Sequence, residues 1–481
     1  MKLTIKSQLF KHTVIMTAVN LIMRSAGVAF NAYLTRKIGS AGIGLFQLVM
    51  SVYSLAVTFS CAGIRLAGTR ITVEASALGK TDIRKSLRIC LAFAAICGSF
   101  FGILLFSLSG IIGSVCLSNV QTASSLRILA VSLPFVAMSS AFGGYFTATG
   151  LIPQYSFVQM LEQASKIGIV VFLTDKLSTR GTAYACMAIV AGMTASEIIS
   201  FLLSSALNAV TSPQKSDKPP AKLFRLLRIA IPDAAGACTR SILLTAEHLL
   251  IPRGFEKSGS GCAEALAAYG RIHAMAMPVM LYPSAVISSL SALLVPELAR
   301  LGEIGDRAAI NASVKRNLKR TIVFSSVCAV IFGIFAPSIS KAVYKTAEAA
   351  EYIRILSPLI PVMYTDMITD GMLKGLDQQF YSMKYNIIDS ALCVILVIAL
   401  LPKYAVKGYI LILYASELIN FYLSLGRLLT VCEIKIFTRF QAFSKLQASR
   451  NTPVRLKICS NARPEYEYQI YRDRAKHSQA P

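Results

Sequence analysis

The sequence predicts an all-α membrane protein whose chain crosses the bilayer about twelve times, in two lobes of six helices each. Three observations lead to this fold class. The 481 residues are 54% hydrophobic and only 15% charged, whereas soluble domains average about a quarter charged residues. Apolar runs of roughly 20 residues, each long enough to cross a bilayer as a helix, recur along the chain. A pattern in the first half also returns in the second half.

The predicted spans follow one another with short polar loops between them. Backbone groups inside lipid must find hydrogen bonds within their own segment, so each span is expected to be helical. The spans cover residues 14–38, 44–67, 87–113, 125–149, 155–174, 181–209, 226–251, 264–295, 320–343, 352–376, 382–402 and 407–430. The first run is expected to stay in place as a span, not to be cleaved as a signal, because others follow it.

Lysine and arginine concentrate in alternate loops, for example 70–88, 215–225 and 300–320. Such loops normally remain in the cytoplasm. Both termini are therefore expected to be cytoplasmic, in a multi-pass protein of the cell membrane. This distribution accounts for the net charge of +25 without a nucleic-acid partner.

The two halves carry matching residues. Three pairs share a separation of 227 positions (354 − 127): Arg127 with Arg354, Pro134 with Pro361, and Gly144 with Gly371. A further match joins "EASALGKTD", which starts at Glu74, to "ELARLGEIGD", which starts at Glu297. The fourth span thus corresponds to the tenth, and the second to the eighth. We expect lobes related by a pseudo-two-fold axis along the membrane normal, an arrangement that binds substrate between the lobes.

Composition divides the chain into four parts. The segment "VTSPQKSDKPPAK" at 210–222 is the only loop that looks like a linker. We therefore expect an N-terminal lobe at 1–209, a cytoplasmic linker at 210–222 and a C-terminal lobe at 223–430. The basic tail at 431–481 is expected in the cytoplasm, where it is either solvated or lies on anionic membrane lipid.

Several spans keep charged or amide side chains where lipid is expected. A charge at a helix centre costs roughly 2.5–3.5 kcal/mol on insertion scales, so these side chains should face protein or water. In three spans they are spaced by four or seven residues, which places them on one helical stripe. The members are Asn20, Arg24 and Asn31; Asp233, Arg240 and Glu247; and Asp366, Asp370 and Lys374.

Arg24 and Arg271 differ from the rest because neither has an acidic residue one helical turn away. A guanidinium binds phosphate oxygens through two parallel hydrogen bonds, so unpaired arginines facing one cavity favour an anionic ligand. We expect Arg24 and Arg271 to bind that ligand, with Asn20 and Asn31 as additional hydrogen-bonding groups. The alternative is pairing of the arginines with acids of the seventh span.

A second set of residues is expected to gate transport or to couple it to an ion. Its members are Asp233, Arg240, Glu247, Asp366 and Asp370. For Asp370 the alternative is neutralisation by Lys374, one turn further along the helix.

The signatures of a cofactor or a metal site are missing from the sequence. Its 11 cysteines lie mostly inside spans and form no CxxC pair. His248 and His273 have no partner at metal-ligand spacing and are expected to be packing residues. There is no GxxxxGK[ST] loop for ATP. We therefore expect no cofactor or metal, and energy from an H⁺ or Na⁺ gradient or from the membrane potential.

Three segments resemble a known family. They are "IMRSAGVAFNAYLTRKIGSAGIGLFQL" at 22–48, "GYFTATGLIPQYSFVQMLEQASK" at 144–166 and "YGRIHAMAMPVMLYPSAVISSLSALLVPELARL" at 269–301. They resemble the polysaccharide-exporter branch of the multidrug/oligosaccharidyl-lipid/polysaccharide flippases, and in particular the stage V sporulation protein B group. The resemblance covers about residues 10–430.

The resemblance implies two lobes, a central cavity and alternating access for a polyprenyl-diphosphate-linked saccharide, such as a cell-wall precursor. Arg24 and Arg271 match cavity arginines of the related lipid II flippases. Phe30 stands where those proteins have a second arginine of helix one, and Gly270 stands where they have an acid. These departures favour a sporulation-type or general polysaccharide exporter.

The expected function is therefore flipping of a lipid-linked saccharide, which makes the protein a transporter and not an enzyme. A cation-coupled drug antiporter of the same superfamily is the first alternative, and it predicts that the acids matter more than Arg24. A membrane-embedded glycosyltransferase or ligase is the second. It would need a large outside loop, whereas the longest one expected lies at 252–263. A scaffold protein would leave the buried charges unexplained.

Overall fold

The computed structural model describes residues 2–78, 82–117, 122–177, 182–211, 219, 223–259 and 261–433. For residues 2–20 the description is limited to the backbone. The tail expected at 431–481 lies outside the described residues apart from 431–433, as does most of the linker expected at 210–222. No β-strand occurs in the ranges that are described.

The helices follow one another with short connections. Their order is α1 (Lys2–Cys61), α2 (Ile64–Leu78), α3 (Ile83–Ile111), the π-helix η1 (Ile112–Cys116), α4 (Thr122–Ala148), α5 (Ile152–Leu177), α6 (Thr182–Thr211), α7 (Leu223–Lys257), α8 (Cys262–Tyr269), the π-helix η3 (Gly270–Ala276), α9 (Met277–Met280), α10 (Ser284–Ile304), α11 (Arg307–Tyr344), α12 (Ala350–Leu356), the 3-10 turn η4 (Ser357–Leu359), α13 (Ile360–Gly375) and α14 (Gln379–Val431).

These helices account for every predicted span. Within the described residues, 8 helical stretches are long and apolar enough to cross a membrane. Two of them hold two predicted spans each, because α1 breaks at Gly39 (φ 72°) and α14 breaks at Ala405 (φ 49°). The two predicted spans outside this set are α7 and the run from α12 to α13. They are helical, but they carry the polar stripes that lower hydropathy. The all-α, polytopic membrane fold is confirmed.

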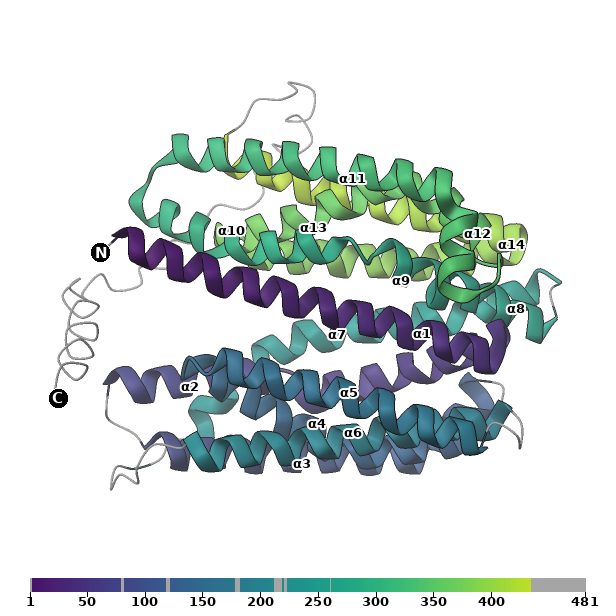
Figure 1. Ribbon diagram of the computed structural model, residues 1–481, viewed down its shortest axis with the longest axis horizontal. Coiled ribbons are helices and arrows are strands. Elements are labelled where there is room, and N and C mark those ends of the chain that lie inside the picture. The colour runs from purple at the N-terminus through teal and green to yellow at the C-terminus, as the bar shows by residue number, and fades with distance from the viewer. Residues whose placement is uncertain are drawn as a thin grey trace. The chain divides into compact units, whose positions relative to one another are not determined.

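The helices gather into two groups (Figure 1). In the first, α3 packs on α4, α5 on α6, and α4 on both α2 and α6. In the second, α7 packs on α14, α10 on α13, and α11 and α14 on α13. We call these groups the first and second lobes. The first half of α1, before Gly39, runs along η3 and α10 of the second lobe.

The repeated residues occupy equivalent places in the two lobes. A Cβ atom on Gly144 of α4 would collide with the backbone of Arg65 in α2. A Cβ atom on Gly371 of α13 would collide with Ser291 in α10. In each lobe the fourth helix thus approaches the second so closely that only glycine fits. This shared contact gives the sequence repeat a structural reason.

The lobes also meet directly in more than one place, and a Cβ atom on Gly63, just before α2, would collide with the backbone of Ala230 in α7. We call the end of the molecule where α2 and α6 end and α3 and α7 begin the basic end, because the sequence between those helices is rich in lysine and arginine, and the other the opposite end. At the opposite end α1 crosses α8 and η3 at Gly44 and Gly270. Added Cβ atoms would strike the carbonyl oxygens of Leu266 and Ser40 respectively, so the two backbones are in contact there.

Candidate functional site

Arg24 bridges α1 and the start of α10. Its Nη1 atom donates hydrogen bonds to the carbonyl oxygen of Leu281 at 2.7 Å and to Oγ of Ser284 at 2.8 Å. Its Nη2 atom lies 3.4 Å from Oγ of Ser288. These acceptors gather here because Pro283, which has no N–H, interrupts the helix between α9 and α10. Tertiary packing therefore holds Arg24 in a fixed, half-buried position.

No carboxylate neutralises Arg24 among the residues with described side chains. Its hydrogen-bond partners are uncharged, and no salt bridge of the described chain includes it. The positive charge is fully retained beside polar groups of the second lobe. Ser25 and Tyr282 extend that polar surface through a hydroxyl–hydroxyl contact of 2.9 Å.

The other three predicted ligand-binding residues fall in different places. Asn31 donates to the carbonyl oxygen of Ala274 in η3, where the π-helix bonding pattern leaves carbonyl groups available. Arg271 donates to the carbonyl of Ala267, one turn earlier in its own helix, at 3.3 Å. It lies within electrostatic range of Tyr352 in α12, and it shares no hydrogen-bonding partner with Arg24. The side chain of Asn20 lies outside the description.

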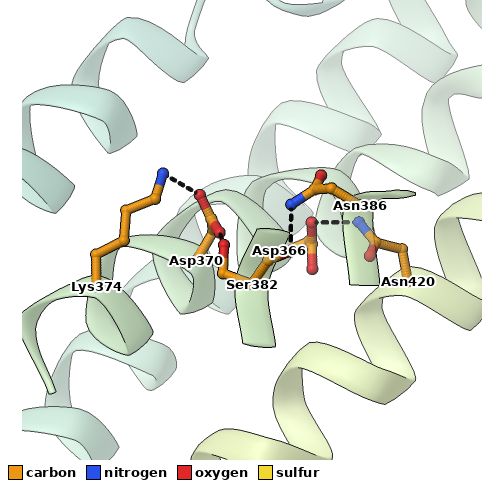
Figure 2. A network of polar contacts seen from close by, with 6 residues as sticks. All are labelled: Asp366, Asp370, Lys374, Ser382, Asn386 and Asn420. Carbon is orange, nitrogen blue, oxygen red and sulfur yellow. Dashed lines mark hydrogen bonds and ion pairs between the residues drawn. The ribbon is translucent and has the colours of Figure 1, made fainter. Parts of the chain in front are cut away.

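A network of polar contacts links α13 and α14 in the second lobe (Figure 2). Asn420 donates to Asp366 at 3.0 Å. Asp370 pairs with Lys374 at 2.6 Å and also accepts a hydrogen bond from the hydroxyl of Ser382. The neutralising pair considered for Asp370 is therefore present, and Asp366 remains apart from it.

More acids surround Asp366 than the sequence analysis identified. Asp389 and Glu417 lie on the two halves of α14: the charge of Asp389 acts on Asp366, and the charges of Asp366 and Asp389 act on Glu417. Glu247 of α7 is 7% exposed and lies within electrostatic range of Asp389 and Glu417. Arg240 is the cation that acts on Asp366 and Asp389. We call Glu247, Asp366, Asp389 and Glu417 the acidic cluster.

Two atoms of this region are buried without a hydrogen-bond donor. They are Oδ1 of Asp366 and Oδ1 of Asn420, counted against the described part of the chain. A buried acceptor without a donor is costly, so it suits a proton or a small hard cation with oxygen ligands. Across the described residues, no group of three or more His, Cys, Asp or Glu side chains has metal-binding geometry.

Asp233, the remaining predicted residue, lies at the basic end. It lines a pocket of about 580 Å³ together with residues of α2, α7 and α14. The structure therefore separates the predicted residues. Arg24 and Asn31 contact the second lobe from α1, and Arg271 lies apart in η3. Glu247, Asp366 and Arg240 lie in or near the acidic cluster, Asp370 pairs with Lys374, and Asp233 lines this pocket. Asp389 and Glu417 could have been found from the sequence by the rule that charges inside spans face protein.

Comparison with known proteins identifies the family. Residues 9–302 match the polysaccharide biosynthesis protein family. Stage V sporulation protein B of Bacillus subtilis (strain 168) is 22% identical over 414 residues, which is 84% of this chain and 80% of that protein.

Solved structures share the fold. The lipid II flippase MurJ in an inward closed conformation superposes with a TM-score of 0.67 at 14% identity, covering 96% of this chain and 100% of the other. An inward-facing multidrug resistance MATE family transporter of the MOP superfamily gives 0.66 at 12% identity, covering 87% and 99%. The chain therefore belongs to the polysaccharide biosynthesis protein family, and it shares the fold of these two transporters.

Proposed function

We propose that the protein flips a polyprenyl-diphosphate-linked saccharide, such as a cell-wall or polysaccharide precursor, across the cytoplasmic membrane by alternating access. Both termini would lie in the cytoplasm. The observation that carries the proposal is Arg24, a positive charge held beside the second lobe with uncharged partners only. The family match and the names of the similar proteins support the same class of cargo.

Arg24 would hold the diphosphate of the headgroup, since guanidinium groups bind phosphate oxygens through paired hydrogen bonds. The hydroxyl groups of Ser284 and Ser288 would turn toward the ligand when Arg24 shifts its bonds to phosphate. Asn20 and Asn31 would bind sugar or phosphate oxygens. Arg271 would receive the headgroup nearer the opposite end, as the lobes change their relative tilt. The lipid tail would remain in the bilayer throughout.

Asp233, Arg240, Glu247, Asp366 and Asp370 would gate or couple this cycle. The unpaired oxygens of Asp366 and Asn420 offer a place for H⁺ or Na⁺ inside the second lobe. Binding of that ion would remove one negative charge from the acidic cluster and alter the packing of α7 against α14. The ion would then shift the balance between the arrangement of the lobes that is open at one end and the arrangement that is open at the other, which links transport to the ion gradient.

The acidic cluster also favours a second candidate, a cation-coupled drug antiporter. In such a protein the carboxylates would bind a lipophilic cation directly. The burial of Glu247, at 7% exposed, argues for a small ion in this cluster instead of a bulky drug.

The deciding experiment is flipping of a fluorescent polyprenyl-diphosphate saccharide in proteoliposomes. Arg24→Ala should lower the flipping rate by about ten-fold or more, since a hydrogen bond to a charged group contributes about 1.5–3 kcal/mol. Arg36→Ala, an exposed arginine on the same helix, serves as the matched control and should flip normally. Normal flipping by Arg24→Ala would overturn the proposal, and uptake of cationic dyes that depends on the acids would favour the antiporter.

A further inference from the structure

The pocket at the basic end lies where three helices from both lobes meet. Its lining residues are Leu66, Arg70 and Glu74 of α2, Arg225, Arg228 and Asp233 of α7, and Gln379, Phe380 and Met383 of α14. The residues of α2 are four apart and so form one helical face. None of the arginines or asparagines proposed to bind the saccharide lines the pocket, so it is a separate site.

One ion pair ties the two lobes together beside this pocket. Arg225 donates to Glu74 twice, with Nε–Oε2 and Nη2–Oε1 distances of 2.7 and 2.8 Å. Both carboxylate oxygens of Glu74, the only acid that α2 contributes to the lining, are thus hydrogen-bonded to Arg225. Glu74 therefore does not neutralise the pocket's other arginines.

Two further arginines face the pocket unpaired. Among the described residues, neither Arg70 nor Arg228 takes part in a hydrogen bond or an ion pair. Asp233 is the remaining acid of the lining. With the Glu74–Arg225 pair set aside, two positive charges face one negative charge, which makes the pocket attractive to an anion that carries phosphate oxygens.

Exposed apolar side chains also occur on the helices that form the pocket. Phe380 of its lining is 67% exposed, and on α7 Phe224 is 75% and Ile231 is 61% exposed. In a membrane protein, such side chains at a helix end face lipid. A ligand that fits this setting has a phosphate at one end and hydrocarbon at the other.

We propose that the pocket binds the headgroup of an anionic membrane phospholipid, such as phosphatidylglycerol, which bridges α2 of the first lobe and α7 and α14 of the second. Its phosphate contacts Arg70 and Arg228, while its acyl chains run along Phe224, Ile231 and Phe380. Basic loops near the cytoplasmic leaflet attract such lipids electrostatically. A lipid that bridges both lobes stabilises the arrangement in which their basic ends are close.

Binding of a labelled phosphatidylglycerol to the full chain in nanodiscs of phosphatidylcholine tests the proposal. The double variant Arg70→Ala/Arg228→Ala should bind about ten-fold or more weakly, as each surface arginine contributes about 1 kcal/mol. Lys315→Ala/Arg316→Ala removes two exposed charges of α11 and should leave binding unchanged. Asp233→Asn removes the remaining negative charge of the lining and should tighten binding. Because misfolding would only weaken binding, such a gain cannot be caused by it.

Competitors distinguish the sources of phosphate. Millimolar inorganic phosphate should not displace the labelled lipid, and displacement would instead assign the pocket to free phosphate. A polyprenyl-diphosphate saccharide should not displace the labelled lipid either. Displacement that is seen in the unmodified protein and lost in the Arg70→Ala/Arg228→Ala variant would instead identify the pocket as a substrate site. Equal binding by the two double variants would also overturn the proposal. Arg24→Ala should retain lipid binding, so the outcome is independent of the proposed flipping activity.

Discussion

At the scale of single residues, partners decide what each charged group can do. Arg24 contacts backbone and hydroxyl oxygens only, so its charge remains available to a ligand. Asp370 is bound by Lys374 and is largely neutralised within its own helix. Asp366 shares its lobe with further acids and keeps one oxygen without a donor. Of the two aspartates of α13, Asp366 is therefore the better candidate for binding a coupling ion.

The prediction at this scale concerns Asp366→Asn. The substitution preserves shape but removes the negative charge, so flipping should lose its response to an imposed Na⁺ or pH gradient. The measurement is the initial flipping rate in proteoliposomes with and without each gradient. Asp377→Asn is the matched control, because Asp377 is exposed and its φ of 58° suits asparagine. A gradient response unchanged in Asp366→Asn would exclude Asp366 as the coupling group.

At the scale of helices, the second and fourth members of each lobe pack closely together at a glycine. Gly144 meets α2 and Gly371 meets α10. Protein interiors are close-packed, so an added methyl group at such a contact must displace its neighbour. The contact at Gly371 differs in one useful respect, because the obstacle is the side chain of Ser291 and not backbone.

Gly371→Ala should therefore destabilise the protein by about 1–3 kcal/mol through overpacking. Combining it with Ser291→Gly removes the obstructing side chain, and the nearest remaining atom would be the Cα of residue 291 at 3.5 Å. Thermal unfolding in detergent should show a lowered Tm for the single variant and recovery in the double. Gly426→Ala, where nothing lies within 4 Å, should leave the Tm unchanged or raised. Failure of Ser291→Gly to rescue would contradict this account.

At the scale of the two lobes, contacts occur near both ends of their interface. The Gly44–Gly270 crossing joins the lobes at the opposite end, while the Glu74–Arg225 pair joins them at the basic end. The first is a contact between backbones, which permits no gradual adjustment. The second is made by exposed side chains, and such a pair contributes only about 0–1 kcal/mol. The pair therefore adds little to closure of the basic end, where Gly63 also packs against the backbone of Ala230 in α7.

Gly270→Val should open the opposite end by wedging η3 away from Ser40 and Gly44. The expected result is faster reaction of an engineered Ser40→Cys thiol with a membrane-impermeant maleimide added outside. Reaction of the same variant without Ser40→Cys supplies the background. Gly110→Val, at the same end but with nothing within 4 Å, should not change the rate. An equal rate in both variants would show that the crossing does not control access.

The membrane fold, the approximate positions of the helices and the duplication could all be predicted from the sequence. This was possible because hydropathy, the alternation of basic loops and the repeated residues can be recognised along the chain without knowing how the helices pack. Sequence reasoning also identified the stripes of polar residues. A helical period tells which side chains share a face, but it does not tell what that face meets.

Which residues each polar side chain contacts could be learned only from the tertiary structure. The break at Gly39 turns the first half of α1 toward the second lobe, which seats Arg24 against Ser284 and leaves Arg271 elsewhere. Packing of α7 against α14 brings Glu247 near Asp389 and Glu417, acids far apart in the chain. The basic-end pocket likewise requires three distant helices to meet. Such meetings depend on the fit of whole helix surfaces, which no local pattern of residues encodes.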